Sequence, residues 1–283
     1  MSPRPGFPAK LDLTSGTPVP RKPLVPAGRT TSAPATVARA GALRPGDVAP
    51  AAAPRAGAPG SLAGPSASVG MDSLRIRARM VQRLAGQGIS DERVLQAMGA
   101  VERHRFVDSA LVNQAYEDTS LPIGLGQTIS KPGVVARMLE LLCAGKTGRL
   151  GRVLDIGTGC GYQAAVLSHL AVEVYSMERL RALHEKARNN LRAFRLPNVH
   201  LLFGDGMVGF PTGGPYAGIV AAAGGDAVPQ AWLDQLAVGG RLVAPIVTAS
   251  GQQALIVVDK TAQGMKQTVL EAVHFVPLKS GIA

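Results

Sequence analysis

The sequence has little of what stabilises small secreted proteins or anchors proteins in membranes. It holds two cysteines in 283 residues, Cys143 and Cys160, which excludes a disulfide framework and a cysteine-rich metal site. No stretch approaches the roughly 18 uninterrupted apolar residues of a membrane helix. The N-terminus lacks the apolar core of a secretory signal. We therefore expect a cytoplasmic protein with free thiols and no membrane partner.

Residues 1–70 have too few core-forming side chains to fold. Thirteen of the 21 prolines fall there, with a single aromatic residue, Phe7. Such a segment buries too little apolar surface to offset its ordering entropy. We predict a disordered tail over 1–70 and a folded domain over 71–283. Eight Lys and Arg against two Asp give the tail +6 of the net charge of +11. Because no aromatics interleave with these charges, we expect a solvated extension rather than a nucleic-acid-binding arm.

A glycine-rich turn lies between a predicted strand and a predicted helix. The apolar run at 153–156 is typical of a buried parallel strand, and 163–170 has a helical pattern. The glycines between them let the backbone approach a ligand. Tyr162 stands where a dinucleotide-binding G-x-G-x-x-G turn has its last glycine, which disfavours a dehydrogenase. The candidate ligand-binding residues of this stretch are Asp155, Gly157, Gly159 and Gly161.

The next two predicted strands also end in acids. The strand at 173–178 ends in Glu178, which follows Gly157 by 178 − 157 = 21 residues. That spacing is typical of an acid that accepts hydrogen bonds from ribose hydroxyls. The strand at 199–203 leads into Asp205 and Gly206. We expect these side chains at the same edge of the sheet as the glycine turn, because parallel strands share their carboxyl ends.

The whole chain after the tail alternates between predicted strands and helices. Three helices precede the polar stretch at 116–132, over 73–86, from an N-cap at Ser90, and over 109–115. The alternation that follows predicts an α/β fold, a doubly wound, mostly parallel, Rossmann-like sheet with N-terminal helices. Further strands are predicted over 216–223, 241–247, 254–259 and 267–276, the last two antiparallel.

A second polar stretch precedes the glycine turn. Residues 116–132 mix turn-forming residues with hydroxyls and amides, so a loop is predicted. Pro132 suits the first turn of a helix. Ser130 then has two interpretations, as the N-cap of that helix or as a hydroxyl that meets a ligand.

Four segments carry a family resemblance: Leu-Pro-Ile-Gly-Leu-Gly-Gln-Thr-Ile-Ser-Lys-Pro at 121–132, the glycine turn at 153–163, Gly-Asp-Gly at 204–206 and Phe-Val-Pro-Leu at 275–278. Together they resemble protein-L-isoaspartate O-methyltransferases. The turn alone is typical of class I S-adenosylmethionine-dependent methyltransferases, whereas the first segment is specific. The resemblance spans about 72–283. It implies methyl transfer from S-adenosyl-L-methionine to the free carboxylate of L-isoaspartyl residues in damaged proteins and peptides, which initiates repair through a succinimide.

The resemblance also implies roles for single residues. Ser130 takes the place of the active-site serine, and Asp205 that of the acid that reaches the adenine amino group. A carboxylate acceptor is ionised at neutral pH and needs no general base or metal. The candidate substrate-binding residues are Gln127, Thr128, Ile129 and His274.

Two alternatives stay open at this stage. A class I methyltransferase with another acceptor, a small molecule or RNA, would share every cofactor residue and differ around 121–131. A non-catalytic cofactor-binding module would instead depend on its basic tail to dock an acidic partner. For the repair enzyme we expect a monomer with damaged polypeptides as partners.

Overall fold

The computed structural model describes residues 67–283, and side chains from Ser73 onward. The predicted tail lies outside these residues except for its last four, which belong to helix α1 (Ala67–Gly86). The predicted helix therefore begins six residues earlier than expected. None of the helices in the described range is long and apolar enough to span a membrane.

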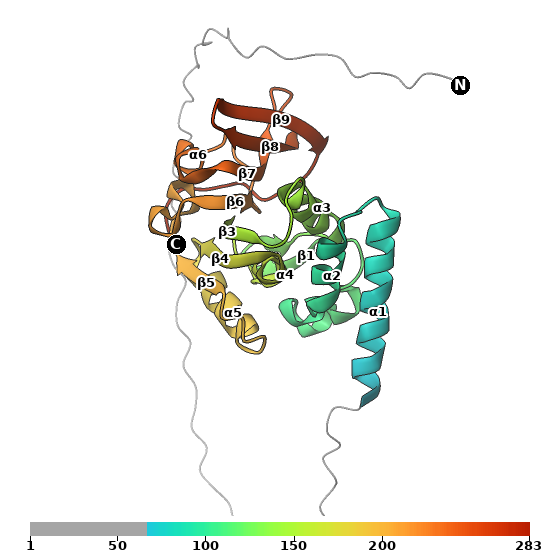
Figure 1. Ribbon diagram of the computed structural model, residues 1–283. Helices are drawn as coiled ribbons and strands as arrows, with labels where there is room; N and C mark the ends of the chain where they lie inside the picture. The colour runs from blue at the N-terminus through green and yellow to red at the C-terminus, as the bar shows by residue number, and fades with distance from the viewer. Residues whose placement is uncertain (1–66) are drawn as a thin grey trace, which may run out of the picture. The chain divides into compact units, whose positions relative to one another are not determined.

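A seven-stranded sheet carries the fold, in the order β5-β4-β3-β6-β7-β8-β9 (Figure 1). The first five strands are parallel, and β8 and β9 are antiparallel, as predicted. The doubly wound, mostly parallel α/β fold is thus confirmed. The strands are β3 (Leu150–Ile156), β4 (Ala171–Glu178), β5 (Val199–Phe203), β6 (Tyr216–Ala221), β7 (Leu236–Val247), β8 (Gln253–Thr261) and β9 (Gly264–Ala272).

Two hydrophobic clusters cover the two faces of the sheet. Val153 of β3 packs into a cluster with the helices α1 to α4, whereas the next residue, Leu154, packs with Trp232 of α6. This alternation is expected because successive strand side chains point to opposite faces. The remaining helices of this part of the chain are α2 (Glu92–Ala100), α3 (Pro132–Cys143), α4 (Tyr162–Leu170), α5 (Arg181–Arg192) and α6 (Gln230–Gln235), with 3₁₀ turns η1 (Arg103–Phe106), η2 (Ser109–Gln114), η3 (Gly206–Val208) and η4 (Pro211–Gly213).

The polar stretch before the glycine turn is a hairpin rather than a loop. Strands β1 (Leu121–Gly124) and β2 (Gln127–Ile129) pair antiparallel and lead into α3. Lys131 occupies the N-cap of α3 without a side-chain cap bond. Asp118 supplies the missing acceptor instead, since its Oδ1 accepts from Gly133 N at 2.7 Å. The N-cap interpretation of Ser130 is therefore wrong.

The N-cap of α2 also differs from the prediction. The side chain of Asp91 accepts from the backbone N of Arg93 at 2.9 Å and caps the helix. Ser90 instead donates its backbone N–H to the Glu140 carboxylate of α3 at 2.6 Å. Both residue types cap helices well, and this tertiary contact with α3 decides between them.

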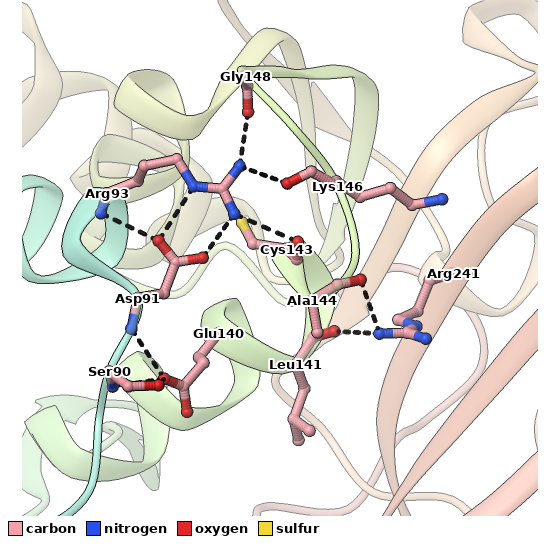
Figure 2. Close-up of polar contacts among 10 residues, drawn as sticks. All are labelled: Ser90, Asp91, Arg93, Glu140, Leu141, Cys143, Ala144, Lys146, Gly148 and Arg241. Atoms are coloured by element: carbon pink, nitrogen blue, oxygen red, sulfur yellow. Dashed lines mark hydrogen bonds and ion pairs between the residues drawn. The ribbon is translucent and has the colours of Figure 1, made fainter.

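Arginine Arg93 closes the carboxyl end of α3 (Figure 2). Its guanidinium pairs with Asp91 at 2.6 Å and donates to the carbonyls of Cys143, Lys146 and Gly148 at 3.3, 2.9 and 2.8 Å. The last carbonyls of a helix have no partner within it. Here Arg93 of α2 binds the carbonyl of Cys143, the last residue of α3, and two carbonyls of the loop that follows, which ties the end of α3 to the N-terminal helices.

A second arginine binds the same helix end from the sheet. Arg241 of β7 donates to the carbonyls of Leu141 and Ala144 at 3.0 and 3.1 Å (Figure 2). Its guanidinium is also paired with Asp259 of β8 at 2.7 Å. Helix α3 is therefore fixed on both sides, and the β1–β2 hairpin enters it at its other end.

Candidate active site

A cavity of about 240 Å³ lies where the carboxyl ends of β3, β4 and β6 meet the β1–β2 hairpin. Strand order reverses here, because β4 lies on one side of β3 and β6 on the other. Such a switch point is where open α/β sheets bind ligands. The predicted site residues that line the cavity are Gln127, Thr128, Ile129, Ser130, Gly157, Gly159, Glu178 and Gly206.

The glycine turn forms the floor of the cavity in a left-handed conformation. Gly157, Gly159 and Gly161 have φ angles of 90°, 56° and 95°, which side chains rarely adopt. A Cβ on Gly159 would lie 3.2 Å from Cδ1 of Ile123, which packs over the turn from β1. Gly161 faces away from the cavity, since a Cβ there would lie 3.1 Å from Leu191 of α5.

Glu178 is a buried carboxylate at the cavity wall. Its Oε2 accepts from Gly159 N at 2.8 Å and its Oε1 from Leu180 N at 2.9 Å. Its exposed fraction is 5%, and it has no ion pair within residues 73–283. A carboxylate has about four acceptor positions. Two therefore remain for a ligand in the cavity.

Asp155 lies beneath the turn and does not line the cavity. It is completely buried, and its two oxygens accept from Nε2 of Gln163 at 2.8 Å and Oγ of Ser176 at 2.7 Å. Burial raises the pKa of Asp155 from 3.8 to about 6, against the lowering effect of these two hydrogen bonds. Ser176 in turn bonds Oγ1 of Thr158 within the turn, at 2.7 Å. The contacts thus connect Asp155 to the shape of the turn.

Asp205 is engaged by the C-terminal segment. Its Oδ1 accepts from Met207 N at 2.8 Å, and its Oδ2 accepts from Gly281 N at 2.6 Å. We call residues 276–283 the strap, because they run along the carboxyl edge of the sheet. In the strap, the carbonyl oxygen of Gly281 also accepts a hydrogen bond from Nε of Arg179 at 2.8 Å. Asp205 does not line the cavity, whereas the strap residues 276–279 do.

A second cavity adjoins the main one beside Ser130. Ser130 is partly buried and lines both the main cavity and this second cavity of about 400 Å³. His274 lies in the second cavity, with Ser120 and Lys131, and not in the first. Ser130 therefore stands where the two cavities adjoin.

Several residues that line the main cavity were not predicted from the sequence. Leu180 and Leu183 lie at the start of α5, and Lys279 belongs to the strap. The Gly-Leu-Gly sequence at 124–126 is a turn signal that could have indicated the hairpin. Only the Phe-Val-Pro-Leu segment at 275–278 carried a sequence signal for the strap, because the place of residues 279–283 depends on contacts with Arg179 and Asp205.

The cavity suits a nucleoside-containing sulfonium cofactor. Glu178 offers free acceptor positions for ribose hydroxyls. Ile156, Met177, Leu180 and Leu183 line an apolar wall for a purine ring. The glycine turn leaves room that a Cβ would fill. The residues present therefore fit S-adenosyl-L-methionine, and no group of His, Cys, Asp and Glu that could hold a metal ion occurs in the described part of the chain.

Known proteins show which family the chain is similar to. Residues 75–283 match the family described as Protein-L-isoaspartate(D-aspartate) O-methyltransferase. A protein-L-isoaspartate O-methyltransferase of Methylibium petroleiphilum is 52% identical over 282 residues, covering 99% of this chain and 97% of its own. One from Burkholderia vietnamiensis is 57% identical over 222 residues, covering 78% of this chain and 71% of its own.

Solved structures show the same fold. A protein-L-isoaspartate O-methyltransferase superposes with a TM-score of 0.66 at 29% identity, covering 73% of this chain and 67% of its own. A Plasmodium falciparum structure in complex with S-adenosyl-L-homocysteine has a TM-score of 0.62 at 24% identity, covering 72% of this chain and 98% of its own. The fold is thus that of a class I S-adenosylmethionine-dependent methyltransferase.

Within that class, the extent of the match decides the family. The chain belongs to the protein-L-isoaspartate O-methyltransferase family. Its cofactor is S-adenosyl-L-methionine, and its activity is methylation of isoaspartyl residues in proteins and peptides. The resemblance based on the hairpin and the glycine turn is confirmed, and the alternatives of another acceptor and of a non-catalytic module are set aside.

Proposed function

We propose that Ser130 positions the isoaspartyl carboxylate for methylation at the opening between the two cavities. The observation that carries this proposal is the state of its hydroxyl. It lines the cavity, is partly buried, caps no helix, and makes no hydrogen bond within residues 73–283. A hydroxyl in this state is available to donate to a substrate carboxylate.

Residues around the glycine turn would hold the methyl donor. When bound, S-adenosyl-L-methionine supplies an electrophilic methyl group on a positively charged sulfur. Glu178 accepts hydrogen bonds from the ribose hydroxyls, while Gly157 and Gly159 let the backbone approach. The Glu178 carboxylate already accepts from two backbone N–H groups, at 2.8 and 2.9 Å, and these hydrogen bonds fix its position before the ligand binds. This support lowers the reorganisation needed on binding.

Three of the predicted cofactor residues act through others. Asp155 shapes the turn through Ser176 and Thr158. Gly161 allows α4 to start close to Leu191. Asp205 holds the strap by its bond to Gly281, and so shapes the wall beside Gly206. We propose positioning roles for these residues, with Glu178 and the first two glycines in direct contact with the cofactor.

The chemistry asks for orientation rather than for a base. The acceptor carboxylate is ionised at neutral pH, since its pKa lies near 4. Neither histidine nor aspartate is among the residues that line the main cavity in the described chain. The enzyme instead brings the acceptor oxygen into line with the methyl group and excludes water. Orientation of this kind contributes about 7–11 kcal/mol to lowering a barrier.

The methyl ester then leaves the site as the product. Esterification replaces a poor leaving group by a good one, so the neighbouring backbone nitrogen can displace methanol and form a succinimide. That ring reopens partly to normal aspartate. We propose that Gln127, Thr128 and Ile129 contact the substrate beside Ser130, with His274 lining the adjoining second cavity.

Substitution Ser130→Ala tests the role of the hydroxyl. We expect kcat/KM on an isoaspartyl peptide to fall about 10- to 100-fold, the scale of losing a hydrogen bond that orients a reacting group. The affinity for S-adenosyl-L-homocysteine, measured by calorimetry, should stay unchanged. Ser109→Ala, at an exposed serine of η2, is the matched control. Full activity of Ser130→Ala would contradict the proposal.

We also propose that the domain at 71–283 carries this activity and that the tail at 1–70 does not. The family match over 75–283 supports this division. Because α1 begins at Ala67, its first turns belong with the domain. The monomeric state and the location in the cytoplasm stay predictions.

A further inference from the structure

The tip of the β1–β2 hairpin combines two unfavourable features. Gly124, Leu125 and Gly126 all have left-handed backbones, with φ angles of 99°, 53° and 68°. Glycine adopts this conformation freely, whereas a leucine there is strained. The Leu125 side chain is also 59% exposed, so it gains little from burial in the chain itself.

The neighbouring residue shows what the hairpin does for its own fold. Ile123 is 4% exposed and packs over Gly159, so its side chain belongs to the interior beside the glycine turn. Lys186 of α5 donates from Nζ to the carbonyl of Ile123 at 2.8 Å and fixes this part of the hairpin. Leu125 lies beyond this fixed point and still lines the cavity.

The exposure of the Leu125 side chain indicates which ligand contacts it. The cofactor occupies the floor of the cavity, against the buried Glu178 and the glycine turn. A polypeptide acceptor approaches from solvent. The same cavity is also lined by Val276 and Pro277 of the strap, which are apolar as well. An apolar side chain of the acceptor would therefore find apolar groups both on the hairpin and on the strap.

We propose that Leu125 is a specificity-determining residue, which packs against an apolar side chain next to the isoaspartyl residue of the substrate. The contact buries apolar area that both partners otherwise leave in water. The contact offsets the strain of a leucine in the left-handed region. Residues with such strained backbones cluster at ligand-binding sites. This inference rests on the proposed function and adds a sequence preference to it.

The test uses the full-length chain and four isoaspartyl peptides. They carry either Leu or Ser, immediately before or immediately after the isoaspartyl residue, and are otherwise identical. The variants are Leu125→Gly and Leu125→Asn, because both residues tolerate the left-handed backbone and so keep the turn. Leu74→Asn is the matched control, since Leu74 is 54% exposed on α1 and lies outside the main cavity.

We expect the wild-type chain to prefer Leu over Ser at one of the two flanking positions. Both Leu125 variants should lower kcat/KM on that Leu peptide about five- to tenfold, mainly through KM, as a partly buried leucine contact is lost. Their kcat/KM on the matching Ser peptide should stay within about twofold, so the preference disappears. Thermal unfolding should show the variants at least as stable as the wild type.

Two outcomes would overturn the proposal. An equal loss on all four peptides, together with weaker binding of S-adenosyl-L-homocysteine, would make Leu125 a cofactor contact. Unchanged kinetics on every peptide would make it a solvated turn residue. If the wild-type chain methylates none of the peptides while binding S-adenosyl-L-homocysteine, the proposed function fails instead, which distinguishes the two failures.

Discussion

The two sides of the cavity are built in opposite ways. The side that we assign to the cofactor comes from one continuous part of the chain, 155–206, where the carboxylates of Asp155 and Glu178 are buried and hydrogen-bonded. The side that we assign to the acceptor comes from the hairpin and the strap, and Pro277 follows Ser130 by 147 residues. It presents an unpaired hydroxyl and the exposed Leu125.

This difference matches what each side must bind. One cofactor of fixed shape is bound well by groups that are already oriented, because little free energy is spent on ordering them. Damaged proteins share an isoaspartyl residue but differ in everything around it. A side formed by a hairpin tip and a strap can adapt to varied neighbours, at the cost of weaker contacts.

Removing the buried charge of the cofactor side should give the largest effect. The folded-state pKa of Asp155, about 6, exceeds its ordinary value of 3.8. Between these values the folded state binds more protons than the unfolded state, so stability falls as pH rises from about 4 to 6. Two pKa units correspond to roughly 3 kcal/mol. We expect Asp155→Asn to abolish this fall.

The measurement is the free energy of unfolding in urea at a series of pH values. The difference between wild type and Asp155→Asn should change by up to about 3 kcal/mol across the interval and stay constant above pH 7. A parallel pair of curves would mean that Asp155 titrates normally. In that case the burial of this acid would not distinguish the two sides of the cavity.

Glu178→Ala tests the cofactor side at its direct contact. We expect the Kd for S-adenosyl-L-homocysteine to rise about 30-fold, or about 2 kcal/mol, since hydrogen bonds to a charged group are lost. Calorimetric titration measures the change. Glu173→Ala, at the other end of β4, removes a carboxylate of the same strand and should leave the Kd unchanged. An unaltered Kd in Glu178→Ala would remove this residue from the site.

The smallest effect is expected where the two sides are joined. Lys186→Met keeps the alkyl stem but loses the 2.8 Å hydrogen bond from α5 to Ile123 of the hairpin. We expect KM for an isoaspartyl peptide to rise about threefold, or about 0.7 kcal/mol, with the affinity for S-adenosyl-L-homocysteine unchanged. Steady-state kinetics and calorimetry on one preparation separate the two. A change in cofactor affinity alone would show that the hairpin serves the cofactor side.

The cofactor side could be predicted from the sequence because its signals are local. A strand, the glycine turn and a helix follow one another within 150–170, and Glu178 ends the next strand as the spacing predicted. The alternation of strands and helices likewise indicated the sheet. Asp155 shows the limit of such signals: it lies beside the turn in sequence, yet its oxygens are taken by Gln163 and Ser176.

On the acceptor side, the sequence resembled a known family, but the local structure around Ser130 could not be predicted from it. Ser130 was a candidate N-cap until Asp118 proved to supply that hydrogen bond. Asp91 rather than Ser90 is the N-cap of α2, because Glu140, 50 residues away, binds the backbone N–H of Ser90. In each case a long-range contact chose between two locally reasonable interpretations. Local propensity carries no information about such contacts.

The separation of hairpin and strap has a consequence for the order in which the enzyme becomes active. Chains are synthesised from the N-terminus, and domains complete their folding only when their distant segments are present. The glycine turn and Glu178 can come together from neighbouring residues, whereas the part of the cavity wall formed by the strap requires the strap to dock on Asp205 and Arg179. Contacts between segments so far apart form late in folding. A growing chain would therefore acquire its cofactor site before its acceptor site.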